Sequence, residues 1–398
     1  MEVWLTSTGY LATYYFWYFS AVGVFEPYLT AFWRQIGFPS ARIGLLNSIM
    51  PGVAAFAPFL WTAYADATRQ GERIFLVNTW ICALVALLIP NLDGFLAVAT
   101  AVLAFSLFRT ALIPLANSMT FRALADRRQG FAAVRLWGTI GYILTAVGLG
   151  IVMDRIGLWA GLHGIVLAMV ACGLVAWLGR SKRRLVLQPV NLKEFLQALR
   201  SRQLILLLVA SAMARMSFGP YQTFFTIHLE RLGLSRTFAG AAWALAAASE
   251  LIVMLCWARM CERASARAWL IAALASFPLR WVLSVFAHDA FTLLVAQLTH
   301  ALTFGVFYLA AVQTVDALVP DGLRASAQGL YASVTFGLGD LLGNALAGIL
   351  YEPLGMAQLY VGATAVSAAA TVLYWVGTRQ AAASPAIASA HVPRGEPR

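Results

Sequence analysis

Residues 8–33 read TGYLATYYFWYFSAVGVFEPYLTAFW, and they carry both features that decide the fold of this chain. The stretch is apolar and longer than the about 20 residues that an α-helix needs to cross a bilayer. Its one charged residue is Glu26. An ionisable side chain near the centre of a membrane helix costs at least about 2.5 kcal/mol, so chains keep one where it faces water, pairs with another charge or moves a solute. The stretch therefore predicts a membrane helix that contributes to a functional site.

Apolar runs of similar length recur as far as Trp375, and twelve can be counted. The 398 residues are 61% hydrophobic and 11% charged, whereas soluble domains carry about 25% charged residues. The short alternating segments of a membrane β-barrel are absent from the sequence. The composition therefore predicts an all-α membrane protein with twelve transmembrane helices.

The net charge of +11 would suggest a nucleic-acid partner in a soluble protein. If the N-terminus lies in the cytoplasm, however, most of the 28 Lys and Arg residues fall in cytoplasmic segments, the densest of them between Arg180 and Arg202. This distribution follows the positive-inside rule. We therefore expect an inner-membrane protein with both termini in the cytoplasm and no nucleic-acid partner.

The chain repeats short patterns at a nearly constant offset of about half its length, as parallel repeats of a transporter do. The matched pairs are Phe25-Glu-Pro-Tyr28 with Phe218-Gly-Pro-Tyr221, Arg34-Gln-Ile-Gly-Phe38 with Glu230-Arg-Leu-Gly-Leu234, and Ile151-Val-Met-Asp-Arg-Ile-Gly157 with Ile349-Leu-Tyr-Glu-Pro-Leu-Gly355. The repeat predicts two six-helix bundles. The predicted boundaries are an N-terminal bundle at 1–179, a basic cytoplasmic loop at 180–203, a C-terminal bundle at 204–377 and a disordered cytoplasmic tail at 378–398.

Four more ionisable residues lie inside apolar runs, namely Arg109, Glu250, Arg280 and His300. A buried Glu beside an Arg and a His can exchange a proton, because each group shifts the pKa of the others. The alternative is a salt-bridge network that only holds three helices together. Asp340 is either a second proton carrier or a structural hydrogen-bond acceptor.

Val134-Arg-Leu-Trp-Gly138, Ser249-Glu250, Arg280-Trp281 and His300 occur in an order that resembles the lactose-permease-like branch of the major facilitator superfamily. The closer likeness is to phenylpropionate-type permeases and nucleoside–proton symporters. The resemblance implies that Glu250, Arg280 and His300 coordinate ligand and couple transport to protons. Sugar symporters of this branch carry an essential carboxylate where this chain has Thr303. The coupling proton is then carried elsewhere, with Glu26 and Asp340 as candidates, or coupling is weaker.

Arg135 and Tyr142 lie two turns apart on one helix face, at the places where the sugar permeases have a sugar-binding Arg and a stacking Trp. The acid that precedes this Arg in the related permeases is Asn117 here. An Arg without that partner suits a carboxylate ligand, which it can hold with two hydrogen bonds. The alternative is that Arg135 pairs with a loop acid such as Asp126.

Other residues complete the candidate site. Glu26 and Arg109 are expected to form an ion pair that serves as a gate or a site element. Tyr14 and Tyr18 either line an aromatic pocket or belong to the interfacial aromatic belt. Arg215 either faces the cavity or snorkels at the cytoplasmic end of its helix.

The superfamily's loop signature survives in part as Asp66-Ala-Thr-Arg69 followed by Arg73. We expect Asp66 and Arg73 to form a charge clasp at the cytoplasmic gate, the alternative being ordinary loop charges.

The sequence thus predicts a secondary active transporter of the major facilitator fold, a proton symporter for a small organic acid, aromatic acids included. Alternatives are a nucleoside or sugar symporter, a drug or metabolite efflux antiporter and a non-transporting receptor or assembly factor. Phosphate-binding, zinc-binding and nucleophile-elbow motifs are absent from the sequence, so no enzyme, cofactor or metal is expected. The expected partners are the substrate, protons and the bilayer, and the expected state is a monomer.

Overall fold

The computed structural model describes residues 8–68, 70–124, 130–179, 201–320 and 323–383. Within these ranges all the regular elements are helical. The prediction of an all-α protein is therefore confirmed.

The N-terminal half has eight α-helices and one short 3-10 turn. They are α1 (Gly9–Gln35), α2 (Ser40–Ala54), α3 (Ala57–Thr68), α4 (Gly71–Leu88), η2 (Ile89–Asn91), α5 (Phe95–Arg109), α6 (Leu112–Leu124), α7 (Phe131–Ile156) and α8 (Trp159–Leu178).

The C-terminal half contains α-helices and two π-helical segments. They are α10 (Arg202–Met216), α11 (Gly219–Arg231), α12 (Arg236–Cys261), α13 (Ala266–Phe286), α14 (Ala290–Leu298), η4 (Ala301–Val306), α15 (Phe307–Leu318), α16 (Arg324–Ala332), η6 (Ser333–Gly339) and α17 (Asp340–Ala383).

Several consecutive elements are parts of one membrane crossing. Pro220 lies in the first turn of α11, where its missing N–H costs little, so the chain resumes helix directly after α10. The α17 segment turns at Gly355, whose φ of 75° is in the left-handed region. In the described residues nine helical stretches are long and apolar enough to cross a membrane. The last of these stretches, Ser326–Arg379, divides at Gly355 into two crossings. Helix α1 and the α2–α3 pair provide two more, so the described helices are consistent with twelve crossings.

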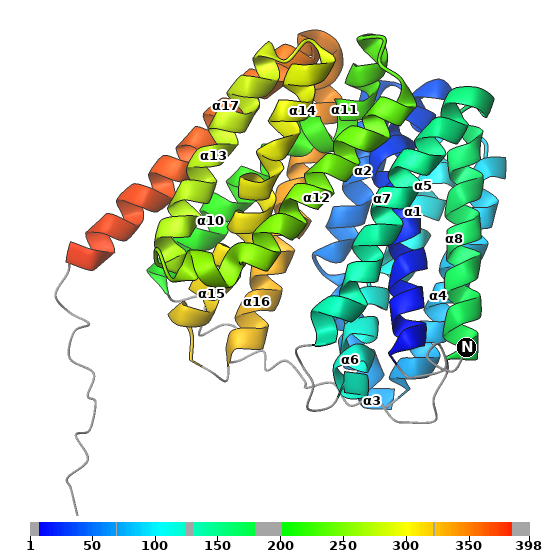
Figure 1. Ribbon diagram of the computed structural model, residues 1–398, viewed down its shortest axis with the longest axis horizontal. Helices are drawn as coiled ribbons and strands as arrows, with labels where there is room; N and C mark the ends of the chain where they lie inside the picture. Colours follow the sequence, from blue (N-terminus) through cyan, green and yellow to red (C-terminus); the bar gives the residue numbers. More distant parts are fainter. Residues whose placement is uncertain (1–7, 69, 125–129, 180–200, 321–322, 384–398) are drawn as a thin grey trace, which may run out of the picture.

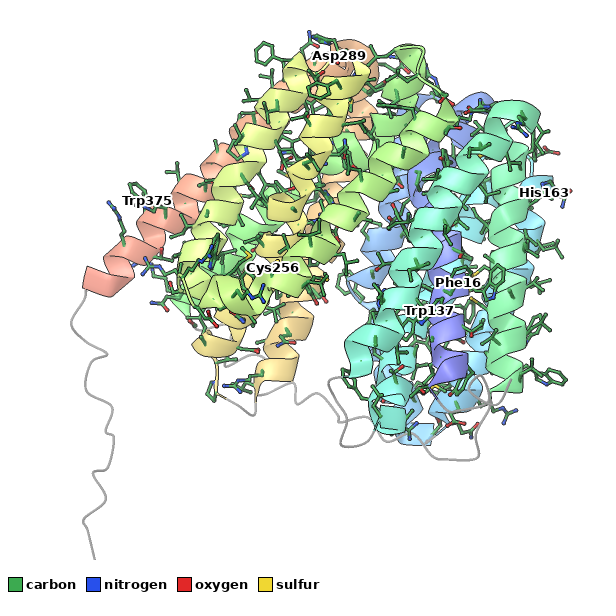
Figure 2. The ribbon with its side chains drawn as sticks, viewed as in Figure 1. Phe16, Trp137, His163, Cys256, Asp289 and Trp375 are labelled. Carbon is green, nitrogen blue, oxygen red and sulfur yellow. The ribbon has the colours of Figure 1, made fainter. Side chains whose placement is uncertain are left out.

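The outer surface of the bundle is apolar. Leu96 is 78% exposed and Leu255 is 75% exposed, which is favourable only against hydrocarbon. Figure 2 shows side chains projecting from the outer faces of both halves, with Trp375 on the far side of α17 from the N-terminal half. The fold is that of a multi-pass membrane protein.

The two halves lie side by side, approach each other at one end and diverge toward the other (Figure 1). We call the approaching end the distal end; it holds the connections 36–39, 157–158, 232–235 and 287–289. The opposite, proximal end holds the start of α1 and the end of α17. At the interface α7 packs on α12 and α2 packs on α17. A Cβ at Gly44 would collide with the backbone of Gly348, so glycine is what lets α2 and α17 come so close.

The predicted boundaries can be compared with the helices only in part. The C-terminal half begins with α10 at Arg202, two residues before the predicted start at 204. Helix α17 continues to Ala383, past the predicted end at 377. The basic segment 180–200 and residues 384–398 lie outside the described residues.

Candidate functional site

Three predicted residues of the C-terminal half come together. Glu250 lies on α12, Arg280 on α13 and His300 between α14 and η4. The Nε2 atom of His300 is 2.6 Å from Oε1 of Glu250, and its Nδ1 atom is 2.6 Å from a guanidinium nitrogen of Arg280. Arg280 and His300 are 1% and 8% exposed, whereas the Glu250 side chain is 20% exposed. The chain of contacts therefore starts in the protein interior and ends at a carboxylate that is partly exposed.

The Arg280 contact fixes the hydrogen positions on His300. A guanidinium can only donate, so Nδ1 of His300 must accept. The imidazole proton is then on Nε2 and is donated to Glu250. His300 is neutral in this arrangement and cannot gain a second proton without losing Arg280. Glu250 is the member of the trio that can take up a proton while both contacts remain.

Further polar groups hold Arg280 in place. It donates to Thr303 Oγ1 at 2.9 Å and to Gln297 Oε1 at 3.3 Å, and the Tyr221 hydroxyl donates to the same amide oxygen at 2.9 Å. Thr303 occupies the position of the missing family carboxylate and supplies a neutral acceptor. The sequence analysis missed Gln297 and Tyr221. Gln297 had a usable signal, because it lies one turn before His300 on the same helix face.

Arg215 and Asp340 form a buried ion pair. Two guanidinium nitrogens of Arg215 lie 2.9 and 2.8 Å from the two oxygens of Asp340, and the side chains are 3% and 9% exposed. The snorkelling alternative for Arg215 is wrong, because the side chain points into the protein. Asp340 is held in a two-pronged bond, the geometry of a structural pair.

In the N-terminal half, Arg135 rests on aromatic rings. Its guanidinium carbon is 3.8 Å from the ring centre of Phe19 and 5.7 Å from that of Tyr15. A Cβ at Gly138 would lie 2.7 Å from both the Arg135 guanidinium and the Phe19 ring, so Gly138 makes room for this stack. Among the described residues, Arg135 has no carboxylate within 4 Å. The alternative partner Asp126 lies outside the described residues.

Tyr15 lies between Asn117 and Arg135 and contacts both of them. The Tyr15 hydroxyl donates to Asn117 Oδ1 at 2.7 Å, and the Tyr15 ring lies beside Arg135. Tyr15 was not among the predicted site residues. The predicted Tyr14, its neighbour, is fully buried in the N-terminal half, bonded to Thr79 at 3.0 Å. A rotation of about 100° per residue separates the two side chains.

Arg109 is bonded to neutral groups. It donates to the Tyr18 hydroxyl at 3.0 Å and contacts Met50 Sδ at 2.9 Å, and its guanidinium carbon is 5.0 Å from the Phe25 ring centre. Its Nε has no hydrogen-bond partner in the described part of the chain. The expected Glu26–Arg109 ion pair is not formed within 4 Å, and Arg109 donates to the Tyr18 hydroxyl instead.

Glu26 faces the space between the halves. It is exposed although Phe25 and Pro27 on either side are buried. Tyr142 is among the groups that act on its carboxyl group. The charges that act on it come from both halves and include Arg109, Arg215 and Asp340.

The predicted charge clasp of Asp66 and Arg73 is described only on the side of Arg73. Arg73 is exposed and donates to Gln70 Oε1 at 3.3 Å. The side chain of Asp66 lies outside the described residues.

Two bundles of membrane-spanning helices that hold buried charges are the plan of a secondary transporter. The chain belongs to the MFS_1 like family, whose family model matches residues 9–361, and it is a multi-pass transporter of the major facilitator fold. The resemblance on which the sequence analysis relied is thereby confirmed.

Two relatives match along most of their length. The maltose permease of Geobacillus stearothermophilus is 26% identical over 359 residues, which are 87% of this chain and 89% of the relative. The probable 3-phenylpropionic acid transporter of Escherichia coli (strain K12) is 25% identical over 378 residues, covering 90% of this chain and 94% of the relative. Both relatives are named for the transport of a small solute.

The crystal structure of the nucleoside transporter NupG superposes with a TM-score of 0.84 at 16% identity, covering 94% of this chain and 99% of that chain. This likeness confirms the fold of the two bundles.

Proposed function

We propose that this transporter is a proton-coupled symporter for a small organic acid, aromatic acids included. It acts as a monomer in the inner membrane, with the proximal end and both termini in the cytoplasm. The observation that carries the proposal is that Arg109 and Arg135 have no carboxylate partner within 4 Å in the described residues. A guanidinium without a counter-charge is costly in a low-dielectric site.

The aromatic stacking supports a carboxylate ligand. The Phe19 ring covers one face of the Arg135 guanidinium. The N–H groups of Arg135 lie in the guanidinium plane and point away from that ring's face. Those N–H groups remain available for two parallel bonds to a carboxylate. Rings beside the same arginine offer contact to an aromatic substrate.

The C-terminal trio supports proton coupling. Glu250 is partly exposed and accepts a hydrogen bond from the one N–H of His300, so we assign the gain and loss of the coupling proton to Glu250. Arg280 and His300 position it. Binding of an anion near Arg135 favours proton uptake at Glu250, because Glu250 and Arg135 act on each other electrostatically across the gap.

Uptake into proteoliposomes tests the proposal with 3-phenylpropionate, uridine and maltose, the kinds of solute for which the relatives are named. One acid anion and one proton carry no net charge, whereas a neutral solute with a proton carries one positive charge. We expect the uptake of 3-phenylpropionate to increase with an imposed pH gradient and not to change with an imposed membrane potential. Uptake by protein-free liposomes is subtracted as the control. Potential-driven uptake of uridine or maltose without acid uptake would overturn the substrate class. Uptake that ignores the pH gradient would overturn coupling.

A further inference from the structure

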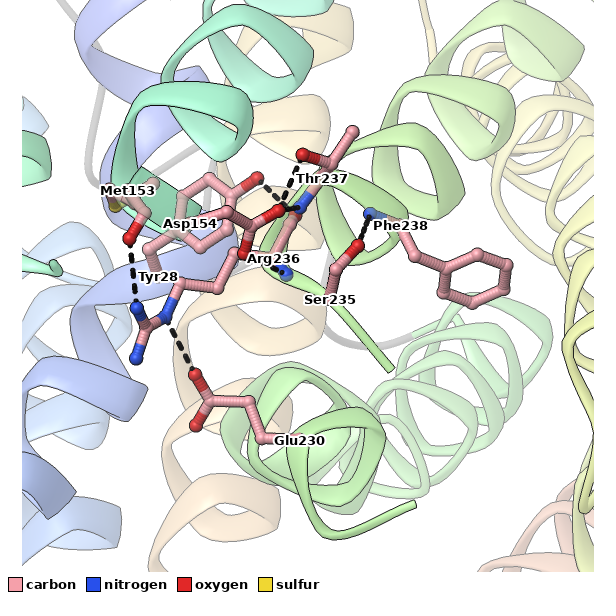
Figure 3. Close-up of polar contacts among 8 residues, drawn as sticks. All are labelled: Tyr28, Met153, Asp154, Glu230, Ser235, Arg236, Thr237 and Phe238. Atoms are coloured by element: carbon pink, nitrogen blue, oxygen red, sulfur yellow. Dashed lines mark hydrogen bonds and ion pairs between the residues drawn. The ribbon is translucent and has the colours of Figure 1, made fainter. Parts of the chain in front are cut away.

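At the distal end a carboxylate of one half caps a helix of the other. Asp154 lies in the last turn of α7, and α12 begins at Arg236. One Asp154 oxygen accepts the backbone N–H of Arg236 at 2.8 Å, and the other accepts the backbone N–H of Thr237 at 2.9 Å and its hydroxyl at 2.6 Å (Figure 3). The first N–H groups of a helix have no partner within the helix, and a negative charge there is stabilised by the helix dipole.

The capping is reciprocal. The Arg236 guanidinium donates to the Met153 carbonyl at 2.9 Å, near the end of α7, and to Glu230 at 3.0 Å. A cation at the C-terminal end of a helix is favourable for the same electrostatic reason. The Tyr28 hydroxyl lies 3.0 Å from the Arg236 carbonyl. We call Asp154, Glu230, Arg236 and Thr237 the Asp154 clasp.

The internal repeat produces a second clasp. Glu352 is the counterpart of Asp154 in the matched sequences, and Ser40 is the counterpart of Arg236. Glu352 accepts from the Ser40 hydroxyl at 2.6 Å and from Arg34 at 2.7 Å. Ser40 is the first residue of α2, so an acid of the C-terminal half again binds the start of a helix in the N-terminal half. Arg34, Ser40 and Glu352 form the Glu352 clasp.

The two clasps differ in their donors. Glu352 is bonded by two side chains, and its own side chain is 53% exposed. Exposed side-chain ion pairs contribute little, because ordering both side chains offsets the attraction. Asp154 is also exposed, but two of its three donors are backbone N–H groups whose direction α12 fixes. The Asp154 clasp is therefore the stronger of the two.

We propose that Asp154 is the gate residue of the distal end: its cap on α12 holds the halves together there, and its release is required for the state that opens distally. Glu352, its counterpart in the internal repeat, contributes less to holding the halves together. The inference needs only that the protein alternates between two openings, as transporters of this plan do, and is independent of substrate and proton coupling.

The test uses spin labels on the two halves. Asp93 and Phe286 are exposed distal positions outside both clasps. They are replaced by labelled cysteines after the four native cysteines have been removed, and the full-length protein is placed in nanodiscs. Pulsed electron spin resonance then gives the distance distribution between the labels. We expect Asp154→Ala to raise the population of long distances at least several-fold, Asp154→Glu to restore much of the short-distance population, and Glu352→Gln to cause a smaller shift.

Asp289 provides a matched control. It caps α14 with bonds to Phe291 N at 2.9 Å, Thr292 N at 3.1 Å and the Thr292 hydroxyl at 2.7 Å, all within the C-terminal half. We expect Asp289→Ala to leave the distribution unchanged. If Asp154→Ala also leaves it unchanged, or if Asp289→Ala shifts it equally, the proposal fails. Should Asp154→Ala not fold, Thr237→Val removes only the hydroxyl donor and keeps both backbone donors. A smaller increase in long distances is then expected, and no increase would overturn the proposal.

Discussion

The arginines inside the helices have different partners in the two halves. In the C-terminal half, Arg215 is bound by both oxygens of Asp340, and Arg280 is held by His300, Thr303 and Gln297. In the N-terminal half, Arg109 and Arg135 rest on aromatic rings and lack a carboxylate within 4 Å in the described residues. One half has its charges satisfied internally, and the other leaves positive charge to be satisfied from outside.

This difference assigns different tasks to the halves. A cation–ring contact is worth about 0.5–2 kcal/mol, which is less than the cost of removing a guanidinium from water. The remaining cost at Arg109 and Arg135 is offset by water or by an anionic ligand. In the C-terminal half, the proposed function gives the one exchangeable proton to Glu250. If the proposed function holds, substrate binding by one half and proton binding by the other should be separable by mutation.

The largest effect is expected for Glu250→Gln. Glutamine is similar in shape, and its carbonyl oxygen still accepts from His300, but it cannot take up a proton. Concentrative uptake driven by a pH gradient should be abolished, while exchange of labelled for unlabelled substrate at equal pH continues. Glu262→Gln, at the exposed end of the same helix, should retain both activities. Accumulation against a gradient by the Glu250 variant would remove Glu250 from proton coupling.

The second prediction concerns Arg135→Lys. Lysine keeps the charge but has no planar group to lie on Phe19 and to offer two parallel N–H groups. Affinity for a carboxylate ligand should fall about tenfold, equal to about 1.4 kcal/mol, as measured by calorimetry. Arg155→Lys, on the exposed end of the same helix, is the control and should bind normally. An unchanged affinity in the Arg135 variant would show that the substrate binds elsewhere.

The sequence was sufficient to predict the architecture and to identify single ionisable residues inside the membrane helices. Apolar runs reveal membrane helices because hydrocarbon leaves few alternatives, and an ionisable residue such as Glu250 or Arg280 is conspicuous inside such a run. Pairing was harder to predict, because it depends on how each helix is rotated. The ion pair expected for Glu26 and Arg109 is not formed, and Arg109 is bonded to Tyr18, whereas Arg215 and Asp340 do pair.

The contacts between the halves could not be predicted at all. Asp154 and Arg236 are 82 residues apart, and no periodicity connects them. The internal repeat did contain usable information, since it aligned Asp154 with Glu352. A repeat shows which positions are equivalent but does not show that both touch the opposite half.

The third prediction restores the acid that the related permeases carry. Asn117→Asp keeps the acceptor for the Tyr15 hydroxyl and adds a negative charge beside the ring that contacts Arg135. The new charge should compete with an anionic ligand and weaken it about fivefold, or about 1 kcal/mol, with no loss for a neutral solute. Asn91→Asp, at the exposed distal end of η2, controls for the added charge. If anion binding survives Asn117→Asp intact, the neutral-solute alternative replaces the organic acid.

The smallest effect is expected for Gly138→Ala. The added methyl group would meet the Arg135 guanidinium and the Phe19 ring at 2.7 Å, and the flexible arginine is the group that yields. Its displacement from the ring should weaken carboxylate binding about threefold, or about 0.65 kcal/mol.

Gly148 lies on the same helix with no atom within 4 Å of an added Cβ, so Gly148→Ala is a matched control. Both changes raise helix propensity by about 1 kcal/mol, and thermal unfolding should show the gain in both variants or a smaller gain at Gly138. Only Gly138→Ala should lose affinity in calorimetry. Equal affinities in the two variants would mean that the stack of Arg135 on Phe19 does not prepare the arginine for its ligand, and the contrast between the halves would then rest on Arg109 alone.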